Sequence, residues 1–186
     1  MHTNPCDIII IRGAPGSGKS QTAKCLAQFF PKGVRLEVDS VRQMVISVDW
    51  KNQQEHINML QVSAGLVCEF LQSDFRPIIV VDTFSGDKVI RFVDRLRHFN
   101  GNLIIHIFGL FASDQELERR FALRQNDEFK DVTISKKLNS DVLKIKCDTE
   151  FQIDTTGQLP MQTARRVYEY VCGCPACRQQ EILPIK

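Results

Sequence analysis

The chain has 186 residues, 43% of them hydrophobic and 25% charged, and its 24 basic and 22 acidic residues give a net charge of +2. This length favours one domain with a single core, and the balanced charge neither requires nor excludes a polyanionic partner. No apolar run approaches the roughly 20 residues of a membrane span and no export signal stands at the start, so we expect a soluble, cytoplasmic protein without a membrane partner.

Five apolar runs rich in β-branched residues predict strands at 7–13, 34–39, 77–83, 102–110 and 150–156. The segments between them predict helices at 19–30, 41–47, 52–73, 86–99, 114–125, 133–146 and 160–171. Strands that alternate with helices are typical of parallel strands joined by crossover helices. The predicted fold class is therefore α/β, a three-layer sandwich around a five-stranded parallel sheet.

The stretch GAPGSGKS, residues 13–20, matches the pattern GxxxxGK[ST] at every fixed position, between the first predicted strand and the first predicted helix. Glycines there let successive backbone N–H groups turn toward phosphate oxygens, and the following helix aims its positive end at the same place. The pattern predicts a nucleotide phosphate site formed by Gly13, Ala14, Pro15, Gly16, Ser17, Gly18, Lys19, Ser20 and Gln21.

The side chains around this loop suit ATP and Mg²⁺. Lys19 offers an ammonium to the β and γ phosphates, and the Ser20 hydroxyl is a hard oxygen ligand for Mg²⁺. The third predicted strand ends in Asp82, whose carboxylate at the edge of the sheet would reach a magnesium-bound water. Many strands end in Asp for turn chemistry alone, which is the structural alternative.

Asp39 and Arg42 lie three residues apart where the second predicted strand meets a helix, so they are expected on one side of it. A carboxylate there can accept the proton of an attacking hydroxyl, and a guanidinium can hold a phosphate or carboxylate of the acceptor. The structural alternative is a helix N-cap at Asp39 and a surface arginine at Arg42.

After the fourth predicted strand, an amphipathic helix places Arg120 and Arg124 four residues apart on one face. A mobile lid over about 112–148 would bring these guanidinium groups onto the transferring phosphoryl group and shield ATP from water. The alternative is a solvated face on which arginines pair with Glu116 and Glu118.

In this order, GAPGSGKS, Asp39-Ser-Val-Arg42, VVDT, Arg120-Phe-Ala-Leu-Arg124 and IDTTG resemble a group of P-loop kinases. These are the polynucleotide kinase, zeta-toxin and chloramphenicol phosphotransferase types, often grouped as AAA-33-like ATP-binding proteins, and the resemblance spans roughly residues 7–171. It implies a nucleotide kinase-like fold and five catalytic residues: Lys19, Asp39 as general base, Arg42 on the acceptor side, and Arg120 and Arg124 as the lid clamp. The region 155–157, with Thr156 and Gly157, would flank the adenine.

The carboxyl-terminal YVCGCPACR lies outside the resemblance, so we expect a kinase domain over 1–171 and a cysteine-containing tail over 172–186. The spacing of Cys172, Cys174 and Cys177 would suit Zn²⁺, with a fourth ligand from Cys147, a histidine or another chain. A reduced, partly exposed tail is the alternative.

These features predict an ATP-dependent phosphotransferase that moves the γ-phosphoryl group to a hydroxyl. The acceptor is either a polynucleotide 5′ end or a small molecule such as a nucleoside, sugar derivative or antibiotic. Two alternatives are a GTPase-like switch, whose guanine-reading NKxD is absent from the sequence, and a nucleotide-binding module that recruits partners or hydrolyses ATP without an acceptor. The oligomeric state stays open.

Overall fold

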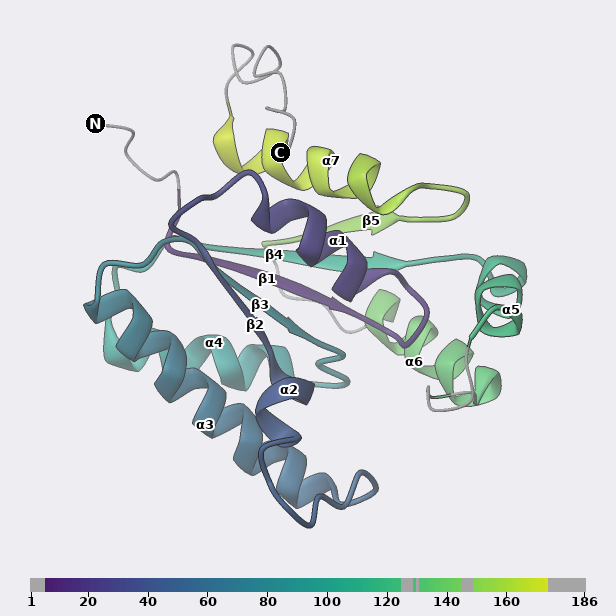
Figure 1. Ribbon diagram of the computed structural model, residues 1–186, viewed down its shortest axis with the longest axis horizontal. Helices are drawn as coiled ribbons and strands as arrows, with labels where there is room; N and C mark the ends of the chain where they lie inside the picture. Colours follow the sequence, from purple (N-terminus) through teal and green to yellow (C-terminus); the bar gives the residue numbers. More distant parts are fainter. Residues whose placement is uncertain (1–5, 125–128, 130, 145–148, 174–186) are drawn as a thin grey trace.

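A parallel sheet of five strands in the order β2-β3-β1-β4-β5 forms the middle layer of the computed structural model (Figure 1). The structure describes residues 6–124, 129, 131–144 and 149–173. The strands are β1 (Ile8–Gly13), β2 (Val34–Glu37), β3 (Ile78–Asp82), β4 (Ile105–Phe111) and β5 (Glu150–Asp154). The helices are α1 (Lys19–Ala27), α2 (Val38–Arg42), α3 (Gln53–Gln72), α4 (Lys88–Phe99), α5 (Asp114–Ala122), α6 (Val132–Lys144) and α7 (Pro160–Cys172).

The central strand β1 shows why the sheet is covered on both faces. Its alternate side chains enter two different cores: Ile8 and Ile10 pack with α3 and α4, while Ile9 and Ile11 pack with α1 and α7. All four isoleucines are fully buried, as expected for a parallel strand between two helical layers. Figure 1 shows α1 and α7 above the sheet and α3, α4 and α6 below it. The predicted three-layer α/β sandwich is confirmed.

All five predicted strands form, but β2 is shorter than predicted. Its pairing with β3 ends at Glu37, and α2 begins at the next residue instead of at 41. The cause is Val38, which is fully buried in the core with α3 and α4 and turns the chain inward. Asp39 therefore lies in the first turn of a helix and not at the end of a strand, and Arg42 lies in the last turn.

Across the described ranges, none of the helices has both the length and the apolar character that crossing a membrane requires. Most of the predicted cysteine tail, residues 174–186, lies outside those ranges, so the predicted domain boundary at 171 stays a prediction.

A buried arginine lies directly before the phosphate loop. Arg12 ends the apolar run of β1 and is 0% exposed, with its Nε 3.0 Å from Glu150 Oε1 of β5. Its two terminal nitrogens donate to the carbonyl oxygens of Phe84 at 3.0 Å and Val142 at 2.8 Å. One guanidinium thus joins the central strand to β5, to α6 and to the loop after β3. The Glu150 side chain is also fully buried.

A glycine makes room for this ion pair. A Cβ at Gly109 of β4 would lie 2.2 Å from Glu150 Oε1 and 3.3 Å from its Cδ. Because Glu150 is held by Arg12, it cannot move aside. The glycine inside an otherwise bulky strand is therefore explained by the carboxylate beside it.

We expect Glu150→Gln to destabilise the protein by about 3 kcal/mol, because it leaves the buried Arg12 charge without its counterion. Glutamine keeps the shape and an oxygen acceptor, so the change isolates the charge. Urea unfolding followed by circular dichroism measures it. Glu118→Gln, which breaks the exposed ion pair with Lys136, is the matched control and should leave the midpoint unchanged. Equal stability of the two variants would contradict the assigned role of the pair.

Candidate active site

The loop over residues 14–18 follows the central strand and leads into α1. Gly16 and Gly18 have φ of 86° and 90°, in the left-handed region that favours glycine. A Cβ at Gly13 would lie only 2.4 Å from Ser17 Oγ. Backbone shape therefore requires two of the three glycines of the motif, and close packing requires the third.

The loop is held in shape from outside through three consecutive carbonyl oxygens. The donors are Ser135 Oγ to Pro15 O, Arg120 Nη1 to Gly16 O at 2.9 Å, and Thr155 Oγ1 to Ser17 O at 3.0 Å. In a trans peptide the N–H points opposite to the C=O. Donors from α6, α5 and the segment after β5 therefore orient the peptide units of the loop from one side, and the sequence motif contains none of them.

Helix α1 presents an unopposed positive end to the same place. Its first N–H groups have no partner within the helix, and its first turn carries no acidic residue. Lys19, Ser20 and Gln21 form this first turn, and Lys19 and Ser20 are half-buried. Backbone N–H groups, an ammonium and a hydroxyl form a donor set that fits a chain of phosphates with a bound Mg²⁺.

Two carboxylates lie beside Lys19. Burial lowers the pKa of Lys19, while Asp39 and Asp82 are close enough to act in the opposite direction. Asp82 is 3% exposed. Its burial opposes ionisation, but its hydrogen bonds with His56 and with the N–H of Phe84 outweigh that effect and lower its pKa. Asp82 is thereby kept as a carboxylate.

The pKa of Asp39 is raised, opposite to that of Asp82. Asp39 is exposed to solvent, yet the protein atoms around it remove enough hydration to raise its pKa, and the negative charge of Asp82 adds to this. The positive charges of Lys19 and Arg42 act the other way without cancelling it. A carboxylate with a raised pKa is a stronger proton acceptor, which suits a general base.

Arg42 is engaged within the protein. It is 4% exposed, and its Nε lies 3.2 Å from Glu55 Oε1. Its Nη2 donates to the backbone oxygens of Asp49 and Asn52, and its guanidinium stacks 4.8 Å from the Trp50 ring centroid. Asp39 and Arg42 share α2 as predicted, but these contacts favour a role for Arg42 in anchoring α2 to α3. Its predicted contact with the acceptor stays a prediction.

The two lid arginines have different surroundings. Arg120 is bound to Gly16 O, to Thr155 Oγ1 at 3.1 Å and to Thr155 O at 2.6 Å, with Glu116 Oε1 2.7 Å from its Nε. Arg124 stacks on the Phe121 ring at 4.2 Å and lowers the pKa of Lys19 by its charge. Arg120 therefore fastens the loop. Arg124 lies beyond the end of α5 at Ala122, so the predicted helix face shared by the two arginines does not form.

Thr156 and Gly157 follow β5 in a turn. Thr156 Oγ1 accepts the N–H of Ser113 at 2.9 Å, and Gly157 has φ of 66°. Thr155, which the sequence indicated only as part of the adenine-flanking region, is the residue that contacts the phosphate loop. The predicted adenine contacts of Thr156 and Gly157 stay a prediction.

The proposed zinc ligands are not tested by the structure. Cys172 is a free, half-buried thiol at the end of α7, while Cys147, Cys174 and Cys177 lie outside the described residues. Within the described ranges, no group of three or more His, Cys, Asp or Glu side chains could hold a metal ion. Zinc binding therefore has no structural support.

Several residues of the site escape sequence reasoning. Ser135 and His56 lie on helices whose patterns show only amphipathicity, and no motif marks either one. Arg12 carried a usable signal, because a charged residue ending the run IIII of a buried strand requires a buried partner. The partner itself, Glu150, is 138 residues away and becomes evident only in the fold.

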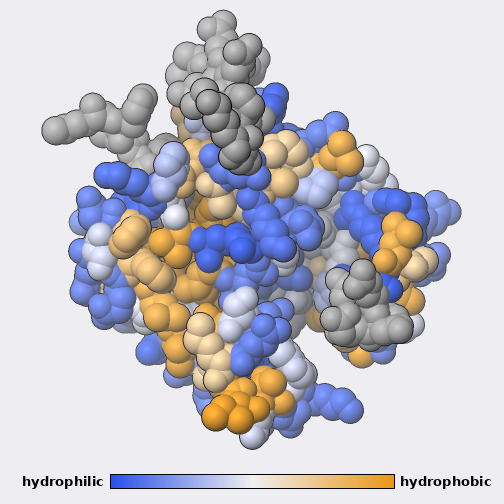
Figure 2. Space-filling model, viewed as in Figure 1, coloured by the Kyte–Doolittle hydropathy of each residue, from blue (hydrophilic) through white to orange (hydrophobic). Residues whose placement is uncertain are grey.

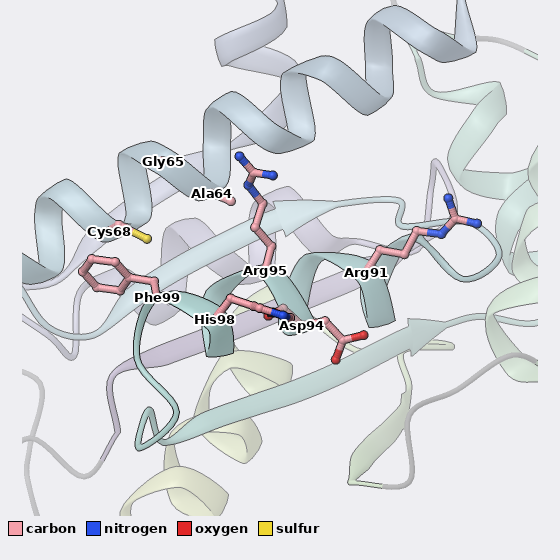
Figure 3. A pocket seen from close by; sticks show the side chains of 8 residues that line it. All are labelled: Ala64, Gly65, Cys68, Arg91, Asp94, Arg95, His98 and Phe99. Atoms are coloured by element: carbon pink, nitrogen blue, oxygen red, sulfur yellow. The ribbon is translucent and has the colours of Figure 1, made fainter.

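A cavity of about 740 Å³ lies elsewhere, between α3 and α4 (Figure 3). It is lined by Ala64, Gly65, Cys68, Arg91, Asp94, Arg95, His98 and Phe99. None of these residues belongs to the phosphate loop or to the carboxylate pair. A phosphate loop binds through backbone N–H groups on an open surface, so the motif and its donors locate the chemistry better than cavity size does.

Solved structures with the same fold include several kinases. The chain resembles the tunicamycin resistance protein of Deinococcus radiodurans, with TM-score 0.68 and 22% identity over 89% of this chain and 95% of that chain. It also resembles a sugar kinase from Janibacter sp., with TM-score 0.67 and 17% identity over 92% and 98%. A gluconokinase from Sinorhizobium meliloti gives TM-score 0.64 and 16% identity over 92% and 94%. The protein therefore has the α/β fold of P-loop kinases.

The model of the AAA domain family AAA_33 matches residues 8–140. The match covers more than half of the chain, from β1 into α6, and the protein belongs to this family. The predicted resemblance to AAA-33-like P-loop kinases is thereby confirmed. A search of curated proteins finds no match to this chain.

We expect Arg120→Met to lower the stability of the folded protein by about 2 kcal/mol, because it removes charged hydrogen bonds that fasten the phosphate loop. The neighbouring Arg119→Met is the control, since Arg119 is 62% exposed and contacts only Glu116 among the described residues. Thermal unfolding without nucleotide measures both variants. If Arg120→Met were as stable as Arg119→Met, Arg120 would be free to act as a lid residue and not as a fastening of the loop.

Proposed function

We propose that the protein is an ATP-dependent phosphotransferase that transfers the γ-phosphoryl group of ATP to a hydroxyl acceptor. The observation that carries the proposal is the phosphate loop, whose left-handed glycines lead into the first turn of α1 with Lys19 and Ser20. The carboxylates of Asp39 and Asp82 lie close enough to interact with the Lys19 charge. Asp82 stays ionised, as a group near a metal ion requires, and Asp39 has the raised pKa that suits a base. The fold shared with P-loop kinases supports the same reaction.

In this proposal the backbone N–H groups of the loop and Lys19 bind the β and γ phosphates. Ser20 would coordinate Mg²⁺ directly and Asp82 would hold one of its waters, and the ion neutralises charge on the phosphate oxygens. The acceptor hydroxyl oxygen bonds to the γ-phosphorus, and Asp39 accepts the proton of that hydroxyl. The bond from that phosphorus to the bridging oxygen breaks, and ADP leaves with the electron pair.

A small-molecule acceptor is the better supported of the two predicted acceptor classes. The segment between α2 and α3 lies next to Arg42 and exposes Met44, Ile46 and Trp50, at 74%, 101% and 48%. Figure 2 shows hydrophobic surface gathered at this lower end of the molecule. Exposed apolar side chains favour an acceptor with an apolar part over a polyanionic nucleic acid end. The engaged guanidinium of Arg42 supports the same choice.

The function is tested by offering γ-labelled ATP and Mg²⁺ with two panels of acceptors. One panel holds small hydroxyl compounds such as nucleosides, sugar derivatives and antibiotics, and the other holds DNA and RNA with 5′-hydroxyl ends. We expect label on a member of the first panel, and Lys19→Ala should lower transfer by orders of magnitude. Label on nucleic acid ends alone would overturn the acceptor class. Release of phosphate with no labelled acceptor in either panel would favour an NTPase.

We expect Asp39→Asn to lower transfer by about 10²-fold to 10⁴-fold, the usual contribution of a general base, while ATP binding stays near wild type. Single-turnover transfer at saturating ATP measures the chemical step. The wild-type rate should fall with falling pH as Asp39 is protonated, at a pH above the ordinary carboxyl range because its pKa is raised. Asp94→Asn on the exposed side of α4 is the control. A loss below about threefold would remove Asp39 from the mechanism.

A further inference from the structure

His56 is a buried histidine beside the carboxylate pair, and the proposed reaction gives it no role. It lies in α3 and is 8% exposed. Its Nε2 is 3.2 Å from Asp82 Oδ1, and its Nδ1 is 3.3 Å from the Nζ of Lys88 in the first turn of α4. One imidazole therefore lies between a carboxylate at the end of β3 and an amine on a different helix.

The contacts of Lys88 determine which nitrogen of His56 carries the proton. An ammonium has three N–H donors and no acceptor, and Lys88 Nζ has three acceptors within reach. They are Gln53 Oε1 at 2.9 Å, Ser85 Oγ at 3.3 Å and His56 Nδ1. Because Nδ1 must accept, the proton of the neutral imidazole lies on Nε2. His56 therefore donates a hydrogen bond to Asp82.

Both oxygens of Asp82 are then oriented by donors from the protein. Oδ1 accepts from His56 Nε2, and Oδ2 accepts from the N–H of Phe84 at 2.8 Å. Two donors on the two oxygens fix the plane of the carboxylate. Each oxygen keeps a further lone pair for a ligand, and Asp82 is close enough to Lys19 and Asp39 for its charge to act on both.

We propose that His56, oriented by Lys88, is a positioning residue that aims the Asp82 carboxylate at the water of a nucleotide-bound Mg²⁺. The inference rests on the proposed function, and it adds two residues from α3 and α4 that no motif marks. Hydrogen-bond partners behind a metal-site carboxylate typically change metal affinity or activity by about 10-fold to 100-fold when they are lost. The same is expected of His56.

The start of α3 would then hold both sides of the site. Glu55 binds Arg42 of α2, the helix that carries Asp39, and the next residue, His56, binds Asp82. The N-terminus of α3 is capped, because the Asn52 side chain accepts hydrogen bonds from the N–H groups of Gln54 and Glu55 at 3.0 and 3.1 Å. This capped helix end thereby fixes the positions of Asp39 and Asp82 relative to each other.

The test measures Mn²⁺ binding to the protein in the presence of ADP, by the paramagnetic resonance signal of free Mn²⁺. His56→Leu removes the donor at similar volume, and His56→Gln keeps an N–H for Asp82. We expect Mn²⁺ affinity to fall by about 10-fold or more in His56→Leu and to stay within about threefold of wild type in His56→Gln. ADP binding without metal should not change. His98→Leu, at an exposed histidine of α4, is the matched control.

Lys88→Met is the second variant, and it keeps the proposal testable if His56→Leu does not fold. It removes the donor to Nδ1 at a half-buried position and should weaken Mn²⁺ binding in the same direction, by a smaller factor. Wild-type Mn²⁺ affinity in His56→Leu, or in Lys88→Met where that is the variant that folds, would overturn the proposal. So would a His56→Gln variant as weak as His56→Leu, since that result indicates packing alone.

The same experiment separates this inference from the proposed function. A wild-type protein that binds Mn²⁺ with ADP, with the expected order of variants, supports the positioning role even if no acceptor is ever phosphorylated. A wild-type protein that binds neither ADP nor ATP would overturn both.

Discussion

The phosphate loop can offer its N–H groups to a nucleotide only while its carbonyl oxygens are held on the other side. Side chains from outside the loop meet this requirement. Ser135 donates a hydrogen bond to the carbonyl oxygen of residue 15, Arg120 to that of residue 16 and Thr155 to that of residue 17. These donors come from α6, α5 and the segment after β5, so the late part of the chain completes a loop encoded near its start. Arg12 strengthens the same junction by joining β1 to α6 and β5.

The start of α3 holds the two elements that carry Asp39 and Asp82. Glu55 and His56 are neighbours in sequence, and they reach Arg42 of α2 and Asp82 of β3. The phosphate loop is therefore fastened by α5 and α6, and the elements that carry Asp39 and Asp82 are fastened by α3. This division agrees with the proposed reaction, because phosphoryl transfer depends mainly on holding two reactants and their charges in place.

The arginines show how one residue type takes different roles in one site. Arg12 is a buried structural cation, Arg42 anchors a short helix, and Arg120 fastens the phosphate loop. Arg124 stacks on the ring of Phe121. A planar guanidinium with five donors can serve each role, so residue identity by itself does not distinguish them.

The sequence by itself determined the fold class, the phosphate loop and the two carboxylates, because these depend on local patterns: apolar runs, a glycine motif and acids next to strand ends. It placed the start of α2 three residues late, since the burial of Val38 depends on the core that receives it. Only the tertiary structure decided that Arg42 and Arg120 face protein groups, that Glu150 is the partner of Arg12, and that His56 binds Asp82. Each of these contacts joins residues from different elements, up to 138 positions apart. A hydrogen bond requires a donor and an acceptor to meet within about 3 Å, and no local pattern records which distant residue completes the pair.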